Sequence, residues 1–284
     1  MQRHRPPTFR INRQSILGSG LVFAGLGGGA STNLYADASG YGNNGTLTAM
    51  DASTDWLWDS TLGRWCTDFD GSNDIIRFPQ LALQPPISFH AWINLAAVNR
   101  YGAVTATGNM GATANNGAML QARATGAIGV GYGSGATEAP NVRRLLYSAN
   151  TLYAAGEWVP VCGIIHALGN SMSLYVRGVN VSGTYSGDYA GAIGYDGQPG
   201  KLMEGNNAFV IGKLSDPLIY SRALSAAEIA QLADPSNVML SGLILPPKRR
   251  IWAAVTAAPP AETLVAGICE SEWVGGICES GWVR

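Results

Sequence analysis

The sequence predicts an all-β fold, an antiparallel two-sheet jelly-roll sandwich, and three observations lead to this fold class. Apolar runs of four to nine residues recur along the chain between Gly, Asn, Asp or Pro, which is typical of strands joined by turns. Only 13% of the 284 residues are charged, against about a quarter in ordinary proteins, and 37 are glycine. No long amphipathic helix separates the runs, so a sandwich is favoured over a mixed fold.

The expected strands share an alternating or fully apolar pattern between turn residues. They cover residues 20–26, 65–70, 87–93, 119–124, 127–132, 158–166 and 171–176. One short helix is expected at 225–232, because Ser225 and Glu228 form a capping box and Pro235 follows soon after.

The two ends of the chain differ in composition from its middle. Residues 1–15 contain four arginines, two prolines and little apolar periodicity, so this basic segment cannot bury enough surface to fold alone. Residues 237–284 are linker-like and end in a nine-residue repeat, whose Gly275-Gly276 junction suits a tight hairpin. The chain is therefore expected to consist of an extended N-terminal arm at 1–15, a sandwich domain at 16–236 and a C-terminal extension at 237–284.

Charge and hydropathy exclude several function classes. Lys and Arg number 18 against 19 acids, so no global field attracts nucleic acid or a membrane surface. No run approaches the roughly 18 apolar residues that cross a bilayer. The apolar stretch 16–26 is broken by glycines and lacks an Ala-x-Ala site, so secretion through a signal peptide is not expected.

Four cysteines, Cys66, Cys162, Cys269 and Cys278, lack the spacing of a zinc site. They are expected to be reduced and to behave as small hydrophobic residues. A disulfide between Cys269 and Cys278 across the C-terminal hairpin remains an open alternative, because the sequence does not fix the geometry.

Several motifs of the middle region follow the order of one known family. They are Tyr35-Ala36-Asp37-Ala38-Ser39-Gly40, Phe69-Asp70-Gly71-Ser72-Asn73-Asp74, Ser88-Phe89-His90-Ala91-Trp92-Ile93, Gly156-Glu157-Trp158-Val159, Leu174-Tyr175-Val176-Arg177-Gly178 and the stretch from Ser215 to Ser225. Through them, residues 16–236 resemble the laminin-G-like, concanavalin-A-like lectin and glucanase jelly-roll family. The chain departs from the family pattern at Arg177, where an acid is common, and at Pro217.

The resemblance implies a structural Ca²⁺, with Asp216 and Asp37 as its side-chain ligands in this sequence. Calcium takes about six to eight oxygens, and the alternative is that both carboxylates only stabilise turns. Asp70, Asn73 and Asp74 look locally like a ligand loop but lack the acidic positions of an EF-hand, so a turn is expected there.

No residues form a catalytic constellation. Glycoside hydrolysis needs two carboxylates at a set separation, and Glu138, Glu157 and Glu204 stand alone. With three histidines and no Gly-x-Ser-x-Gly elbow, a hydrolytic triad is not supported, and His90 is expected to be an ordinary sheet residue. The sequence predicts a protein that is not an enzyme, and a secreted glucanase-like enzyme is the least favoured alternative.

The favoured function is a structural component of a virus particle, exposed on the virion surface. It is suggested by the two extensions, the low charge and the rejected signal peptide. The segment Pro247-Lys248-Arg249-Arg250-Ile251-Trp252 after such a domain resembles phage-encoded proteins, which implies a capsid decoration or a tail or fibre component.

The expected partners are the major capsid or other virion proteins and copies of the chain itself, with no nucleic acid and no membrane. The candidate partner-binding residues are Arg3, Arg5, Arg10, Arg13, Arg249, Arg250, Trp252, Trp273 and Trp282. Buried aromatic anchors dominate many interfaces, although the repeat tryptophans can equally pack on the sandwich.

The alternative function is a carbohydrate-binding module that recognises a host surface glycan, in an extracellular protein. Tyr101, Tyr132 and Tyr195 lie in Gly-rich segments and are the expected sugar-stacking residues. Trp92, Trp158 and Tyr175 lie within alternating runs and are expected to be core aromatics instead.

Overall fold

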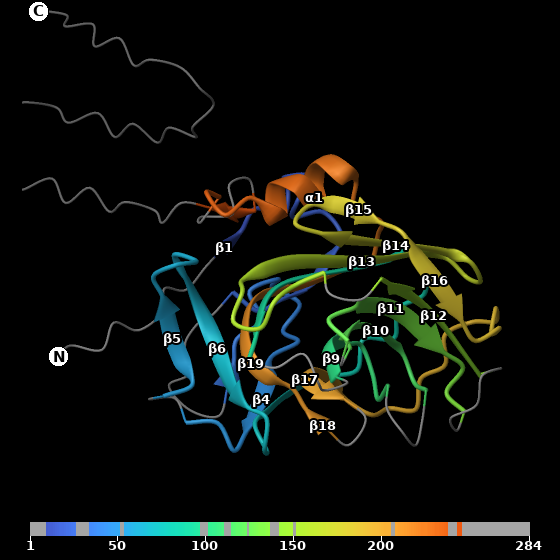
Figure 1. The fold of residues 1–284 in the computed structure, drawn as a ribbon, viewed down its shortest axis with the longest axis horizontal. Coiled ribbons are helices and arrows are strands. Elements are labelled where there is room, and N and C mark those ends of the chain that lie inside the picture. The colour runs from blue at the N-terminus through green and yellow to red at the C-terminus, as the bar shows by residue number, and fades with distance from the viewer. Residues whose placement is uncertain are drawn as a thin grey trace, which may run out of the picture. The chain divides into compact units, whose positions relative to one another are not determined.

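The chain forms two antiparallel sheets packed face to face, with one short helix, as the computed structural model shows (Figure 1). The structure describes residues 10–26, 34–51, 54–96, 102–110, 115–123, 125–136, 142–149, 152–205, 208–237 and 243–245. The prediction of an all-β jelly-roll sandwich with a single short helix is confirmed for this part of the chain. None of its helices is long and apolar enough to span a membrane.

The larger sheet has the strand order β16-β12-β11-β10-β9-β17-β7-β4-β3, with β18 paired to β17. Its strands are β3 (Leu34–Tyr35), β4 (Gly45–Thr48), β7 (Ile75–Phe78), β9 (Gly102–Ala106), β10 (Ala118–Ala122), β11 (Ile128–Gly133), β12 (Arg143–Ser148), β16 (Gly183–Ser186), β17 (Gly200–Gly205) and β18 (Ala208–Phe209).

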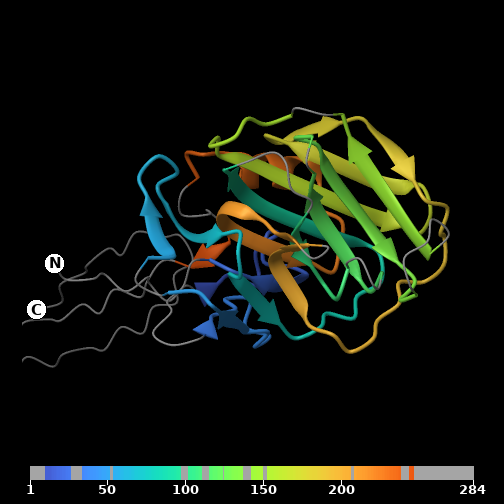
Figure 2. The ribbon, with the colours of Figure 1, turned by 60° about the horizontal axis from the view of Figure 1, so that its bottom comes forward.

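The smaller sheet has the order β15-β14-β13-β8-β19-β6-β5, with β2 paired to β19. Its strands are β2 (Leu21–Ala24), β5 (Trp56–Asp59), β6 (Arg64–Asp70), β8 (Ile87–Leu95), β13 (Val159–Ala167), β14 (Ser171–Val176), β15 (Val179–Val181) and β19 (Ile211–Tyr220). Figure 2 shows the two sheets as stacked layers.

The main core lies between the sheets and follows from the two-residue alternation of side chains along each strand. The larger sheet contributes Leu120 and Val130, and the smaller sheet contributes Phe89, Ile93 and Leu174, all fully buried. Truncating one such side chain to alanine typically costs about 2–5 kcal/mol, so this layer accounts for much of the stability.

A second core lies on the outer face of the smaller sheet, beneath helix α1 (Ala226–Ala233). Ile229 and Leu232 of the helix pack with Cys162, Leu218 and Tyr220 of the strands. The helix therefore covers this face of the smaller sheet (Figure 1). In the part of the chain that the structure describes, no helix covers the outer face of the larger sheet.

The helix begins where the capping box predicted it. The Ser225 amide donates to Glu228 Oε2 at 2.8 Å, and the Glu228 amide donates to Ser225 Oγ at 3.3 Å. Arg222 donates to Glu228 Oε2 at 3.0 Å and also to the Ser19 carbonyl at 2.7 Å. This arginine thus fastens the N-terminal segment to the helix start.

A buried polar cluster lies between β8, β19 and the end of α1. Arg64 forms a 2.7 Å ion pair with Asp216, whose φ of 49° falls at a register shift in β19. The guanidinium lies 5.1 Å from the Trp92 ring, and the Trp92 indole donates to the Leu232 carbonyl at 3.1 Å. His90 is fully buried beside this pair, and burial together with the nearby Arg64 charge lowers its pKa to about 3.

The first and the last strand of the described chain pair with each other. Strand β1 (Arg10–Ile11) pairs with β20 (Ile244–Leu245), and the Asn12 amide donates to the Leu243 carbonyl at 2.7 Å. Leu243 is fully buried in the second core. The expected boundaries at 15 and 236 therefore differ from the structure, in which residues 10–15 and 243–245 belong to the packed domain.

Removal of residues 1–15 is expected to destabilise the domain, because it deletes β1 and exposes Leu243. It also removes Arg13, whose Nη2 donates to the Ser39 carbonyl at 2.6 Å. The lost burial and hydrogen bonds correspond to about 2–4 kcal/mol of unfolding free energy. Urea unfolding measures this value, with removal of residues 1–9 as the matched control. Equal stability of both truncations would show that the β1–β20 pairing contributes nothing.

Acidification is expected to destabilise the domain through His90. Its pKa is about 3 when folded and near 6.5 in a flexible chain, so the unfolded state binds the extra proton. The stability is complete above pH 6.5 and falls as the pH drops from 6.5 toward 3. Unfolding of the wild type and of His90→Leu at several pH values measures this. A stability difference between the two proteins that does not change with pH would contradict the assignment.

Candidate functional site

The outer face of the larger sheet is built around a strand with glycine at every outward position. In β11, Ile128, Val130 and Tyr132 point into the main core, and the alternating Gly129, Gly131 and Gly133 face outward. The register places Gly129 opposite Tyr147 and Gly131 opposite Leu145 of β12. Small outward residues on β11 therefore leave room for the side chains of β12.

Tyr147 and Leu145 occupy that room. A Cβ atom at Gly129 would lie 2.6 Å from Tyr147 Cδ1, and one at Gly131 would lie 2.4 Å from Leu145 Cδ2. A Cβ atom at either position would therefore clash with β12. Only glycine at Gly129 and Gly131 allows the Tyr147 and Leu145 side chains to lie directly against the surface of the sheet. Tyr147 is only partly buried in this position, which gives the sheet face an aromatic residue whose placement is set by close packing.

Arg123, which follows β10, extends over the same aromatic residue. Its guanidinium carbon lies 3.8 Å from the centroid of the Tyr147 ring, within the range of a cation–π interaction. Arg143 lies on the same face of β12 as Tyr147, since the two are separated by an even number of residues. On β16, Ser186 and Thr184 stand opposite Leu145 and Tyr147.

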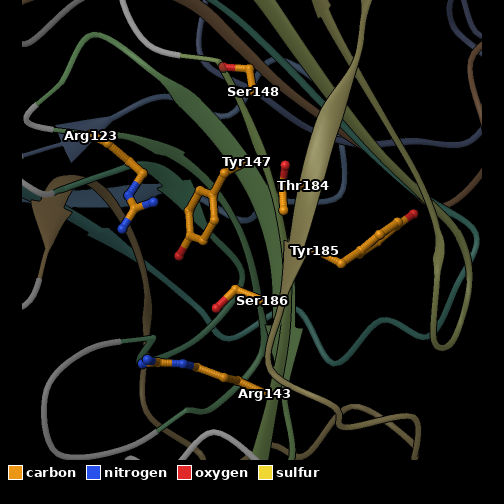
Figure 3. A pocket seen from close by; sticks show the side chains of 7 residues that line it. All are labelled: Arg123, Arg143, Tyr147, Ser148, Thr184, Tyr185 and Ser186. Carbon is orange, nitrogen blue, oxygen red and sulfur yellow. The ribbon is translucent and has the colours of Figure 1, made fainter.

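These side chains line a hollow with a volume of about 340 Å³. Its lining residues are Arg123, Arg143, Tyr147, Ser148, Thr184, Tyr185 and Ser186 (Figure 3). We call this feature the Tyr147 hollow. Figure 3 shows Tyr147, Ser186 and Arg143 on one side of the β12 and β16 ribbons and Tyr185 on the other. Tyr185 accepts a hydrogen bond from the Met172 amide at 3.0 Å, and so supports the wall from behind.

The lining chemistry suits binding and not acid–base catalysis. Guanidinium groups donate hydrogen bonds, hydroxyl groups donate and accept them, and the tyrosine ring offers an apolar surface. Among the described residues that line it there is no Asp, Glu, His or Cys, the side chains that most often act as general acids or bases or activate a serine nucleophile. The hollow is therefore a candidate binding site.

The tyrosines expected from the sequence lie elsewhere. Tyr132 is fully buried, and its hydroxyl donates to the Tyr189 carbonyl at 3.2 Å and accepts from the Gly169 amide at 2.6 Å. Its ring belongs to the main core, so it offers no face to a sugar, which corrects that expectation. Tyr195 donates to the Leu83 carbonyl at 2.7 Å and stabilises a loop. Tyr101 lies outside the described residues.

The expected calcium ligands both have partners within the protein. Asp216 is paired with Arg64, so a cation at that carboxylate would face a guanidinium 2.7 Å away. Asp37 accepts hydrogen bonds from the amides of Ala24, Ser39 and Asn43 at 2.8–3.0 Å and stabilises the loop that follows β3. Within the described residues, no three acidic, histidine or cysteine side chains gather as metal ligands. These residues do not fit a Ca²⁺ site.

Of the expected partner-binding residues, Arg13 lies within the described structure with its side chain. It contacts its own chain, because its guanidinium bonds to the Ser39 carbonyl and lies 4.6 Å from the Tyr41 ring. Arg10 forms part of β1 through its backbone. The others lie outside the described residues, as do Cys269 and Cys278: Arg3, Arg5, Arg249, Arg250, Trp252, Trp273 and Trp282.

The two described cysteines are free and buried, as predicted. Burial raises the pKa of the Cys66 thiol to about 12. Its thiolate is therefore scarce near neutral pH, and the thiol is a poor nucleophile.

Sequence reasoning missed the Tyr147 hollow, although one signal pointed to it. Glycine recurs at every second position of Ile128-Gly129-Val130-Gly131-Tyr132-Gly133, which predicts one crowded face and one empty face of a strand. Tyr132, on the crowded face, is the residue of that pattern expected to stack on a sugar. The hollow instead lies on the empty face, where side chains of the neighbouring strand fill the space.

Comparison with known proteins gives the family. The family model described as the concanavalin A-like lectin/glucanases superfamily matches residues 70–230. No curated protein matches the chain.

Solved structures with the same fold include binding domains and parts of enzymes. The binding domain of Paraclostridial Mosquitocidal Protein 1 gives a TM-score of 0.53 at 15% identity, covering 78% of this chain and 53% of that one. Domain 4 of the arabinanase AbnA from Geobacillus stearothermophilus, in complex with arabinotriose, gives 0.50 at 14% identity, with coverages of 75% and 98%. A Trypanosoma rangeli sialidase gives 0.52 at 13% identity, with coverages of 78% and 34%.

The chain thus spans about half of the mosquitocidal binding domain and about a third of the sialidase structure. At these identities the likeness shows the fold alone. The family model matches residues 70–230, more than half of the 284 residues, and the chain belongs to the concanavalin A-like lectin/glucanase superfamily.

Proposed function

We propose that the sandwich is a carbohydrate-binding domain and that the Tyr147 hollow is its binding site. The observation that carries the proposal is the placement of Tyr147, low over the glycines of β11 with Arg123 at 3.8 Å from its ring. Hydroxyl and guanidinium groups surround it on a sheet face that no described helix covers.

A sugar presents two kinds of surface, and the hollow offers a partner for each. The C–H groups of a pyranose or furanose ring are weakly apolar and pack on an aromatic or apolar surface, as Tyr147 provides. The sugar hydroxyls need hydrogen-bond partners, which Ser186, Thr184 and the two arginines supply. Because close packing already fixes Tyr147, little side-chain entropy is lost when a ligand binds.

Two of the similar structures support a binding role. One is the binding domain of a mosquitocidal protein, and the other is an arabinanase domain in complex with arabinotriose. Catalysis would need titratable groups at the reacting bond, and the described residues that line the hollow include no carboxylate. A glycosidase is therefore less well supported than a binding module.

Substitution of Tyr147 by Ala is expected to weaken glycan binding about tenfold or more, the effect of losing roughly 1.4 kcal/mol. The matched control is Tyr41→Ala, because Tyr41 is an exposed tyrosine that also lies beneath an arginine, with Arg13 at 4.6 Å. Affinity electrophoresis in polysaccharide gels measures both. Equal affinities for the wild type and Tyr147→Ala would exclude the hollow, and no retention by any polysaccharide would exclude the function.

A second function, display of this domain on a virus particle, is favoured by the pairing of β1 with β20. This pairing places residue 10 beside residue 245. The chain therefore continues in both directions from one place on the sandwich. Two extensions that begin side by side suit attachment to a common partner, such as the capsid, tail or fibre of a phage.

The attachment proposal predicts that each extension is needed for incorporation into the particle, and that neither is needed for folding of the sandwich. Versions lacking residues 1–9 or 246–284 keep β1 and β20 and should melt at the same temperature as the full sandwich. Their amount in purified particles, measured by quantitative mass spectrometry, should fall about tenfold or more, as expected when roughly 1.4 kcal/mol of binding energy is lost. Normal incorporation of both versions would contradict the attachment proposal.

A further inference from the structure

We propose that the folded chain cross-links itself, through an isopeptide bond between Lys201 Nζ and Asn109 Cγ that forms with Glu204 as the proton carrier. Four features of the larger sheet carry the proposal. The two reacting side chains are in contact, a carboxylate lies beside them, the amine is buried, and a distorted residue in β17 brings the three groups onto one face. The modification site is separate from the Tyr147 hollow and does not depend on a ligand there.

The reacting side chains already touch. Lys201 lies on β17, and its Nζ donates a hydrogen bond at 3.1 Å to Asn109 Oδ1, in the loop that follows β9. The carboxamide carbon of Asn109 is bonded to that oxygen at about 1.2 Å, so Nζ lies within about 4.3 Å of the carbon that it attacks. Atoms poised to react lie about 3–3.5 Å apart. A small movement of the lysine side chain therefore reaches the reactive arrangement.

A carboxylate lies beside the amine. Glu204 Oε1 is 3.8 Å from Lys201 Nζ. Arg77 donates to Glu204 Oε1 at 3.2 Å and to Oε2 at 3.4 Å, and these two charge-assisted bonds hold the carboxylate in one orientation. A movement of about 0.8 Å brings Nζ and Oε1 to hydrogen-bonding distance. Glu204 can thus take a proton from the amine and pass it to the leaving group.

Burial favours the reactive form of the amine. Lys201 is only 5% exposed, although lysine is rarely buried in proteins. Burial lowers the pKa of the Lys201 ammonium, and this effect outweighs the attraction of Glu204, which acts in the opposite direction. The uncharged amine is the nucleophile. It is therefore more abundant here at neutral pH than in an exposed lysine.

A left-handed residue in β17 brings the lysine and the carboxylate together. Side chains three residues apart in a regular strand point to opposite faces, yet Lys201 and Glu204 form an ion pair. Between them, Leu202 and Met203 are both buried in the main core, and Met203 has a φ of 55°. This backbone conformation is unfavourable for a residue other than glycine, and such strain concentrates at functional sites. Here it returns Glu204 to the face of Lys201.

The reaction balances within the chain. The Lys201 ammonium transfers one proton to Glu204, and the freed amine attacks the carboxamide carbon of Asn109. The Nζ–Cγ bond forms, and the Cγ–Nδ2 bond breaks. A second proton from the lysine nitrogen and the proton held by Glu204 both go to the departing Nδ2, which leaves as an ammonium ion. One amide replaces another and Glu204 is a carboxylate again, so no co-reactant is consumed.

The bond ties the loop after β9 to the neighbouring strand β17. Lys201 and Asn109 are 92 positions apart, so the cross-link closes a long loop and lowers the entropy of the unfolded chain. The melting temperature is therefore expected to be about 10 °C higher with the bond than without it.

Mass spectrometry of the purified full chain tests the proposal. The intact mass is expected to be lower than that of the sequence by one molecule of ammonia. A protease digest should contain a branched peptide that joins Lys201 to Asn109. Succinimide formation at an asparagine also releases ammonia, and the branched peptide distinguishes the cross-link from it.

Three variants and a matched control assign the roles. Lys201→Arg and Asn109→Ala should keep the full mass and lack the branched peptide. Glu204→Gln keeps both reacting groups and should react at least about a hundredfold more slowly, since a positioned proton carrier typically contributes about 10²–10⁴-fold. The control is Lys213→Arg, which changes a lysine that pairs with Asp59 at 3.5 Å and should leave the cross-link intact. Thermal unfolding verifies that each variant is folded.

Two results would overturn the cross-link. One is a folded wild type that keeps its full mass after prolonged incubation and releases Asn109 and Lys201 in separate peptides. The other is loss of ammonia with no branched peptide. A Glu204→Gln variant that forms the bond as fast as the wild type would contradict the role of Glu204 as the proton carrier.

Discussion

The covering of one sheet face by helix α1 is the constraint on which the rest of the structure depends. A two-sheet sandwich has two outer faces, and each needs either polar side chains or a covering layer. Here Ile229 and Leu232 of α1 pack against Leu218 and Tyr220 of β19 and so bury the outer face of the smaller sheet. That face is used for stability, and the proposed binding surface lies on the outer face of the larger sheet, which has no helix among the described residues.

The helix stays in place because contacts distant in sequence converge on it. Arg222 links its capping box to the Ser19 carbonyl, and Trp92 bonds to the Leu232 carbonyl near its end. The pairing of β1 with β20 adds Leu243 to the same buried layer. The second core thus depends on both ends of the chain, which is why the domain extends past the boundaries expected from composition.

In the larger sheet, the pairing of β11 with β12 determines which tyrosine lies on the outer face. Glycine at the outward positions of β11 lets Tyr147 lie across the sheet and leaves Tyr132 to fill the main core. The consequence is a rigid, partly exposed ring beside hydroxyl and guanidinium groups. The proposed binding surface thus depends on the absence of side chains at the outward positions of β11.

The sequence was sufficient for features that depend on neighbouring residues and insufficient for those that depend on pairing. The helix start was predictable, because the capping box lies within four residues. The alternating runs predicted the strands and the fold class. The ion pair between Arg64 and Asp216, separated by 152 residues, was not predictable, and the family resemblance implied a calcium ligand at Asp216 instead. Tyr147 was missed for the same reason, since its exposure depends on the glycines of the adjacent strand.

Hydrogen exchange of the full chain, with and without a polysaccharide that it retains, tests the central claim most directly. The account predicts that the ligand slows amide exchange in β10, β11, β12 and β16, the strands around Tyr147, and leaves α1 unchanged. Slower exchange in the β5–β6 hairpin or at α1, with no change around Tyr147, would show that binding occurs on another face and would contradict the account.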